Sequence, residues 1–326
     1  LLVLECNQAH LHDDFVDDPA VLALQFNAIK AVLARQVNLE TLEVIRGSFF
    51  AYPFDTNGIQ LKKLVLFIPM CTPVELRNMK AFVKTQTQLE SVVLNVLCQR
   101  SVDFNDCFDH FVKLPTLNEI RIVFYDEQEM TEHYRNYTFV NPSVKDVYLG
   151  LQGISQDYQQ ILNTTSRLFP NTTKLHLNMD SERVIEMTLD RLTPMASAFN
   201  SLADFKHLDT LTIDRVLTPI LREIRVPTLK KFTATGIMFS LVEDWTVFFR
   251  NNPAIENLRI QLSLFGNATL PTFLETVVTN LPKIKQIKIC SREGLDFDDD
   301  QRMKQLFNTS NTLKSITFCR FNLVKV

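Results

Sequence analysis

Cys107 and His110 stand three residues apart in the stretch FNDCFDHFVKL, and this spacing could serve two kinds of chemistry. A thiol beside an imidazole can act as a nucleophile with its base, and both groups can also bind zinc. Each chemistry needs further partner residues, and the neighbouring sequence offers no motif that supplies them. We therefore expect a buried thiol on a helix, with the imidazole at the surface.

Two other stretches are rich in metal-binding residue types. HLHDD at 10–14 combines two imidazoles with two carboxylates. DFDDD at 296–300 resembles a calcium loop that lacks its glycine and its final glutamate. A solvated loop is the better interpretation of the first stretch. The second is better explained as the acidic start of the helix DQRMKQLF, where negative charge complements the helix dipole.

Catalytic and nucleotide-binding signatures are absent from the sequence, which contains no GxxxxGK[ST], GxGxxG, HExxH or GxSxG. We therefore expect no enzymatic activity, no metal site and no cofactor. Any function then has to come from side chains that a scaffold displays, and the scaffold has to be found first.

A short repeated phrase identifies that scaffold. LPTLNEIRI at 114–122 and LPKIKQIKI at 281–289 place apolar residues at the first, fourth and sixth positions of a frame that starts at Leu117 and Ile284. The frame recurs about every 28 residues, and Leu1, Leu4 and Cys6 resemble a truncated copy. Its first position is filled by Leu39, Leu61, Leu89, Leu117, Val144, Thr172, Leu208, Leu229, Ile255, Ile284 and Leu313.

Prolines are in phase with this frame. In six copies a proline stands two residues before the first apolar position, at Pro115, Pro142, Pro170, Pro227, Pro253 and Pro282. Proline ends a helix and favours an extended segment after it. The stretches before several of these prolines have apolar residues at helical spacing, such as Phe104, Phe108 and Phe111. Each repeat is therefore predicted to be a strand, a loop and a helix.

This pattern predicts an α/β fold, a leucine-rich-repeat solenoid or horseshoe of about 11–12 irregular repeats. A parallel sheet would line its concave face and helices its convex face, with a core shared by neighbouring repeats. We expect one domain over 1–326. Residues 7–38 and 178–207 are inserts whose register the pattern does not fix. Neither end resembles a polar capping repeat, so we expect the chain to be a fragment that lacks an N-terminal segment.

Composition limits the partners and the compartment. A net charge of −3 argues against a nucleic-acid partner, and no uncharged apolar run is long enough to span a membrane. The six cysteines are scattered without a CxxC pair, which favours thiols in a reducing, cytoplasmic or nuclear compartment. Five N-x-S/T sequons favour the alternative, a secreted chain: Asn136, Asn163, Asn171, Asn267 and Asn308.

Within each predicted strand, the residues between the apolar positions should face the concave surface. They include an apolar and aromatic stripe in the first half and basic residues in the second half. Exposed aromatic residues with arginine are typical of interface hot spots, so we expect a protein or peptide target there, with its acidic part at the basic end. The candidate ligand-binding residues are Val65, Phe67, Val93, Arg121, Val123, Tyr148, His176, Lys231, Arg259 and Lys288.

The chain resembles the leucine-rich-repeat region of arthropod-type F-box/leucine-rich-repeat proteins. The resemblance lies in the helix-bearing repeat, in the phrases FVKLPTLNEIRI and VTNLPKIKQIKI, and in cysteines near strand ends, Cys290 and Cys319. It implies the substrate-recognition part of an SCF-type ubiquitin ligase, joined to the ligase adaptor through an F-box before residue 1. The alternative is a secreted or cell-surface recognition protein of the innate-immunity type.

Overall fold

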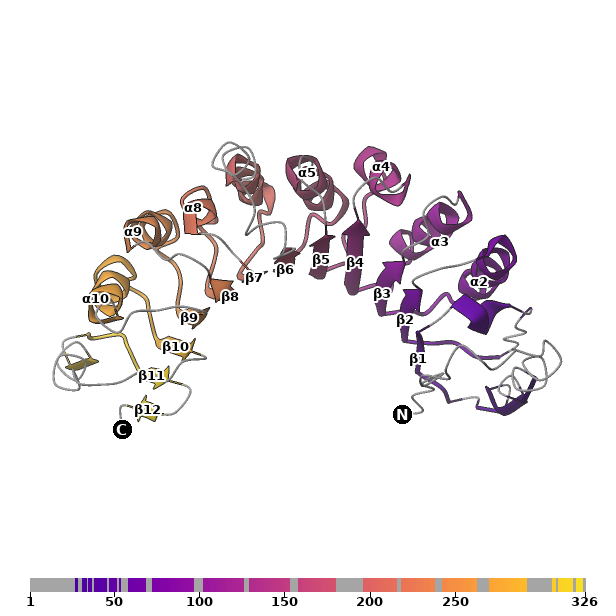
Figure 1. The fold of residues 1–326 in the computed structure, drawn as a ribbon, viewed down its shortest axis with the longest axis horizontal. Helices are drawn as coiled ribbons and strands as arrows, with labels where there is room; N and C mark the ends of the chain where they lie inside the picture. The colour runs from indigo at the N-terminus through magenta and orange to yellow at the C-terminus, as the bar shows by residue number, and fades with distance from the viewer. Residues whose placement is uncertain are drawn as a thin grey trace, which may run out of the picture. The chain divides into compact units, whose positions relative to one another are not determined.

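The computed structural model contains two compact units, residues 1–146 and 147–326. Figure 1 shows their ribbon. The structure describes residues 27–28, 31–33, 35–36, 38–45, 47–51, 53, 58–68, 72–96, 102–125, 129–152, 158–179, 196–215, 218–237, 242–262, 270–291, 307–308, 310–318 and 321–324. Each unit is described by itself, and the expectation of one domain over 1–326 stays a prediction.

The first unit is a parallel sheet with helices on one face (Figure 1). Its strands lie side by side in sequence order: β1 (Thr41–Val44), β2 (Lys63–Ile68), β3 (Ser91–Val96) and β4 (Glu119–Tyr125). The helical segments are η1 (Gly47–Phe50), α2 (Pro73–Thr85), α3 (Val102–Val112) and α4 (Glu129–Asn136).

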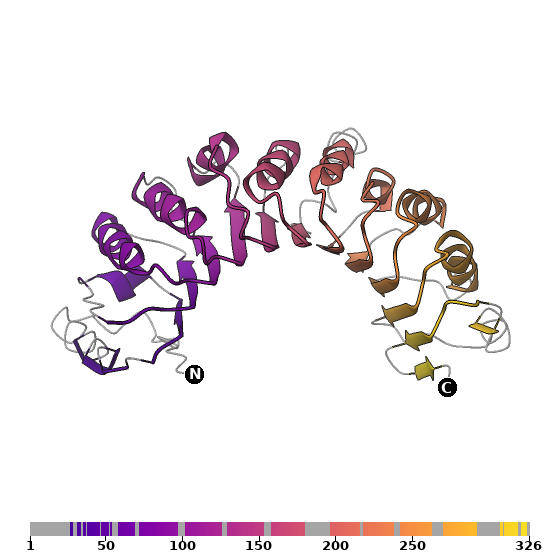
Figure 2. The ribbon, with the colours of Figure 1, turned by 180° about the vertical axis from the view of Figure 1, so that it is seen from behind.

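The second unit repeats this arrangement, which Figure 2 shows from behind. Its strands are β5 (Asp146–Gln152), β6 (Lys174–Met179), β7 (Thr210–Asp214), β8 (Lys231–Ile237), β9 (Asn257–Leu262), β10 (Gln286–Ser291), β11 (Ser315–Phe318) and β12 (Phe321–Val324). Strands β6 to β11 pair in parallel, and β12 pairs antiparallel with β11. The helical segments are α5 (Tyr158–Leu168), η2 (Phe199–Asp204), α8 (Thr218–Leu221), α9 (Val242–Asn251) and α10 (Leu270–Asn280).

The predicted frame coincides with the strands of both units. Its apolar residues are buried, and equivalent positions are register partners, as with Leu64 and Val92 or Ile287 and Ile316. The backbone follows the same period. The Glu90 carbonyl accepts from the N–H groups of Asn118 and Glu119 at 2.8 and 3.0 Å, and Lys230 does the same for Glu256 and Asn257 at 2.8 and 3.0 Å. The chain therefore folds as an α/β leucine-rich-repeat solenoid, and this prediction is confirmed.

The helices fill the space over the sheet with aromatic side chains. The predicted helix residues Phe104, Phe108 and Phe111 are buried in α3. In the second unit the Trp245 ring meets Phe248 and Phe273 edge-on, with ring centroids 5.9 and 5.4 Å apart. These large aromatic side chains fill the core between the sheet and the helices. They do so although the lengths of the strands and helices vary from repeat to repeat.

Buried amides brace some of these repeats, a feature that the sequence patterns did not predict. The Asn252 side chain, just before Pro253, donates to the carbonyls of Ile224 and Phe248 at 2.9 and 2.7 Å and accepts from the Val226 N–H at 2.7 Å. Asn141, just before Pro142 in the first unit, donates to the carbonyls of Val112 and Leu114 at 2.7 and 2.9 Å and accepts from the Ser143 N–H at 2.9 Å. In α9 the helix ends just before the proline, and the asparagine side chain between them hydrogen-bonds to the backbone of the preceding repeat.

Of the two inserts, only part lies within the described residues. In 178–207 the structure describes the end of β6, helical residues 196–198 and η2, whose Phe199 and Leu202 are buried. Most of 7–38, including the truncated copy before it and HLHDD at 10–14, lies outside the described residues, as does DFDDD at 296–300.

Candidate recognition surface

The strands alternate between a face under the helices and an open face. The frame residues point toward the helices and are buried, so the residues between them form the open face. Nine of the ten candidate residues lie on this face and reach solvent, as the strand alternation predicted. Val65, Val93, Tyr148 and His176 are half-buried, and Phe67, Arg121, Lys231, Arg259 and Lys288 are exposed.

Val123 is the exception, since its side chain is only 8% exposed. It follows the same alternation on β4, but its side chain is short and branched. Arg121, two residues before it on the same face, is the longer side chain and is exposed. The prediction of Val123 as an exposed anchor is wrong.

An apolar strip crosses β2 and β3 of the first unit, formed by Val65, Phe67 and Val93. Val65 and Val93 are register partners on neighbouring strands, and Phe67 lies opposite Asn95. The Phe67 side chain is 43% exposed. The strip is small, and its most prominent group is the Phe67 ring.

Polar residues border the apolar strip on β4. Glu119 accepts from Ser91 Oγ at 2.9 Å and from Arg121 Nε at 2.6 Å. Burial alone would raise the pKa of Glu119, but these hydrogen bonds and the Arg121 charge lower it below its ordinary value. Arg121 is therefore a compensated charge that also orients Glu119.

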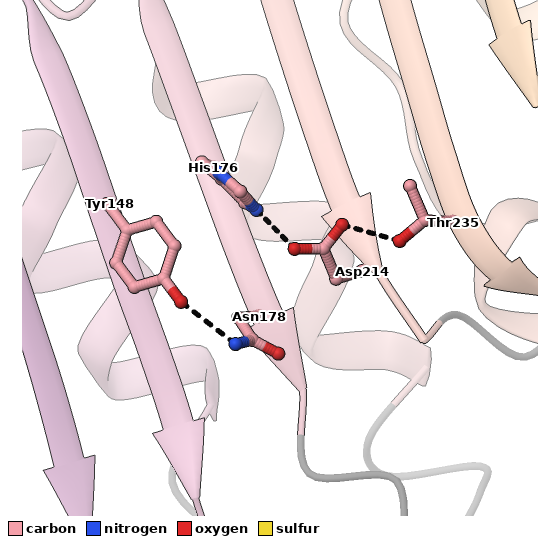
Figure 3. Close-up of polar contacts among 5 residues, drawn as sticks. All are labelled: Tyr148, His176, Asn178, Asp214 and Thr235. Atoms are coloured by element: carbon pink, nitrogen blue, oxygen red, sulfur yellow. Dashed lines mark hydrogen bonds and ion pairs between the residues drawn. The ribbon is translucent and has the colours of Figure 1, made fainter. Parts of the chain in front are cut away.

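A hydrogen-bonded group that we call the Tyr148 cluster occupies the open face of the second unit (Figure 3). It consists of Tyr148, His176, Asn178, Asp214 and Thr235, from strands β5 to β8. Asn178 Nδ2 donates to the Tyr148 hydroxyl oxygen at 2.8 Å, and the Tyr148 and His176 rings meet edge-on with centroids 4.6 Å apart. These contacts hold a half-buried aromatic ring in one orientation.

The carboxylate of Asp214 anchors the other side of the Tyr148 cluster. His176 Nε2 lies 2.5 Å from one oxygen, and Thr235 Oγ1 donates to the other at 2.5 Å. Because a carboxylate only accepts, Nε2 carries the proton. Burial alone would raise the pKa of Asp214, but the bonds from His176 and Thr235 and the nearby Arg215 charge lower it below its ordinary value.

Unusual backbone lies directly beside this cluster. Arg215, which follows Asp214, has a φ of 63°, and Gly236, which follows Thr235, has a φ of 57°. The β8–β9 register shifts between Ala234 and Ile237, which marks a bulge in β8. A bulge changes where the neighbouring side chain points. Here it accompanies the Thr235 contact to Asp214, and the Arg215 N–H donates to the Thr235 carbonyl at 2.7 Å.

A basic strip lies further along the open face of the second unit, formed by Lys231, Arg259 and Lys288. Arg259 and Lys288 are register partners on β9 and β10. Lys231 lies on β8, opposite Asn257, the residue two before Arg259. The predicted basic end of the surface thus corresponds to adjacent, exposed cations on three neighbouring strands.

Sequence reasoning named Tyr148 and His176 as candidates but did not join them to Asp214 and Thr235. His176 and Asp214 are 38 residues apart in the sequence, and only the strand register brings them together. A signal was present, because Asn178, Asp214 and Thr235 all follow the last apolar residue of their frames. Comparing one frame position across consecutive repeats would have grouped these polar residues.

Of the two cysteines that the structure describes, one differs from the prediction. Cys107 is buried in α3, as expected, and His110 Nε2 lies 3.1 Å from the Gln86 carbonyl oxygen. Cys290, at the end of β10, is disulfide-bonded, so the expectation of a thiol there is wrong. Its partner lies outside the described residues. Scattered cysteines far apart in sequence can still meet when their strands are neighbours.

Within the described ranges, no group of three or more His, Cys, Asp or Glu side chains is arranged to hold a metal ion. In the same part of the chain, no helix combines the length and the apolar character needed to cross a membrane. The open face of the first unit therefore displays an apolar strip, and the open face of the second unit displays the Tyr148 cluster and a basic strip.

No protein-family model matches the chain, and no curated protein matches it in sequence. An internalin (inlF) from Listeria monocytogenes is similar over 90% of this chain and 89% of its own, with 11% identity and a TM-score of 0.37. A chain of a TLR13–ssRNA13 complex is similar over 90% of this chain but 44% of its own, with 12% identity and a TM-score of 0.39. These likenesses are too weak to carry a conclusion.

Proposed function

We propose that this chain is a non-catalytic recognition protein that binds a protein partner on the open face of its sheet. The observation that carries the proposal is the composition of that face. In the first unit it presents an exposed phenylalanine, and in the second unit it presents an oriented tyrosine and adjacent cations, while the frame residues of the same strands are buried. Aromatic residues and arginine contribute most of the energy at protein interfaces.

Two kinds of recognition protein fit this proposal, and they differ in the compartment where they work. An SCF-type substrate receptor would work in the cytoplasm or nucleus, where thiols are kept reduced. The Cys290 disulfide instead supports a secreted or cell-surface recognition protein. The four sequon asparagines within the described residues, Asn136, Asn163, Asn171 and Asn308, are all exposed. We therefore favour the secreted form, and the F-box form rests on the resemblance of the repeats.

Partner capture tests the recognition role. The chain with Phe67→Ala should recover at least tenfold less of a partner than the unchanged chain, measured by quantitative mass spectrometry after affinity capture. Val74→Ala is the matched control, because Val74 is a similarly exposed apolar residue on α2, at 47%. Equal recovery by both variants would contradict binding through the open face.

Expression through the secretory pathway tests the compartment. We expect a glycosidase to shift the mobility of the secreted chain and the shift to shrink when Asn171, which lies in an exposed turn, is changed to Gln. The competing outcome is recovery of the ubiquitin-ligase adaptor with the native protein and no glycan. That result would reject the secreted form and leave the recognition role standing.

A further inference from the structure

We propose that the basic strip of Lys231, Arg259 and Lys288 binds an acidic peptide segment of the partner. This inference rests on the proposed recognition function and adds the chemistry of one part of the ligand. The argument uses the register of β8 to β10, the exposure of the three side chains and the distribution of charge around them.

The first step concerns the geometry of the three cations. Arg259 and Lys288 are direct register partners, and neighbouring strands are about 4.8 Å apart. Lys231 stands on the next strand, two residues out of register with Arg259, so the strip extends about 10 Å across the strands and about 7 Å along them. An extended peptide rises about 3.3 Å per residue and alternates its side chains, so a segment of about five residues can bring carboxylates to all three.

The second step is that these cations are not compensated within the described part of the chain. None of the three makes an ion pair there. Other basic residues of the protein are matched with acids, such as Lys285 with Glu256 at 2.6 Å and Lys62 with Glu40 at 2.6 Å.

The third step is the composition around the strip. The described open-face residues of β8 to β11 include no carboxylate, and apart from the basic strip they are the uncharged Thr233, Thr235, Asn257, Gln261, Gln286, Cys290, Ser315 and Thr317. Like charges on directly opposite residues of neighbouring strands destabilise a sheet. The fold gains nothing from the Arg259–Lys288 pair, whereas a bound carboxylate would relieve the repulsion and accept from both.

The fourth step separates an acidic peptide from a polyanion. Nucleic-acid binders neutralise many phosphates and carry a basic excess. This strip has three cations, and the chain as a whole has a net charge of −3. Long-range repulsion therefore disfavours a polyelectrolyte, while a short acidic segment interacts mainly with the local charge, because salt screens the rest within about 8 Å.

Direct binding of a defined peptide tests the inference. The probe is a fluorescent eight-residue peptide of alternating Asp and Gly, with an Asn and Gly peptide as its control, measured by anisotropy on the whole chain. We expect the acidic peptide to bind at least tenfold more tightly than its control, and its affinity to fall about tenfold between 50 and 200 mM salt.

Two double variants with the same change in net charge locate the site. Arg259→Gln with Lys288→Gln should weaken the acidic peptide at least tenfold. Lys206→Gln with Arg225→Gln, at two exposed positions of the same unit, should change its affinity less than twofold. All four side chains are exposed, so both variants should fold, which circular dichroism checks.

Three outcomes would overturn the inference: no preference for the acidic peptide, equal weakening by both double variants, or tighter binding of single-stranded RNA or heparin at equal charge. These outcomes differ from failure of the proposed function. If Phe67→Ala still abolishes partner capture while the peptide does not bind, the recognition role stands and the acidic chemistry is rejected.

Discussion

At the scale of single residues, buried amides and the Asp214 carboxylate show how polar groups serve the scaffold and the surface differently. Asn252 is completely buried, and its side chain makes three hydrogen bonds, to backbone groups of Ile224, Val226 and Phe248. Asp214 is half-buried and fixes side chains on the open face. The first role should appear in stability, the second in pH dependence.

Replacing Asn252 tests the bracing role. Asn252→Ala removes three hydrogen bonds and leaves the Val226 N–H and the Ile224 carbonyl buried without this partner, so we expect a loss of about 2–4 kcal/mol in the free energy of unfolding. Urea denaturation measures it. Asn200→Ala, an exposed amide that bonds to Glu223, should cost less than about 0.5 kcal/mol, and an equal loss for both would contradict the bracing role.

Acid titration tests Asp214. Its folded pKa lies below the ordinary value of 3.8, so its contribution to stability is present above pH 3.8 and is lost as pH falls through the folded pKa. The unfolding free energy of Asp214→Asn should therefore fall less steeply below pH 3.8 than that of the unchanged protein. Parallel curves for the two proteins below that pH would show that His176 and Thr235 do not hold the carboxylate.

At the scale of elements, the strand frame was predictable because it depends on residues that are close together in the sequence. Alternation of buried and open positions depends only on residues two apart, so Leu64, Leu66 and their equivalents could be placed from sequence. The bulge in β8 was not predictable, because it depends on the close approach of Gly236 to Arg215, the residue that follows β7. The Tyr148 cluster was missed for the same reason, since cross-strand partners have no local signature.

Substitution at the bulge tests its geometry. A Cβ on Gly236 would lie 3.3 Å from Arg215 Cγ, and a φ of 57° is unfavourable for a residue with a side chain. Gly236→Ala should therefore lower the free energy of unfolding by about 1–3 kcal/mol. Adding Arg215→Gly removes the crowding atom, so the cost of Gly236→Ala should shrink in that background. An unchanged cost would place the strain elsewhere.

At the scale of the whole molecule, overall charge and local charge point in different directions. A chain with a net charge of −3 still displays three adjacent cations on one sheet face. Net charge describes solubility and long-range repulsion, whereas recognition depends on what a single face presents. Composition alone therefore argued against a nucleic-acid partner. The strand register was needed to show which residues could contact an acidic peptide.

The cysteines link this scale to the compartment. Ile289 and Phe318 are register partners on β10 and β11, and the next residues in the sequence are Cys290 and Cys319. We therefore expect Cys319 to be the disulfide partner of Cys290. A peptide map of the secreted, unreduced protein should contain these two cysteines in one linked species, and iodoacetamide should label neither before reduction.

The energetic consequence of that bond should be large. Closing a loop of about 30 residues stabilises a folded chain by about 3–4 kcal/mol in the chain-entropy description. A reductant should lower the unfolding free energy of the unchanged protein by this amount, whereas Cys290→Ser should start at the lower value and not respond. If reductant leaves the unchanged protein unaffected, the bond does not form in solution, and the strongest support for an oxidising compartment is lost.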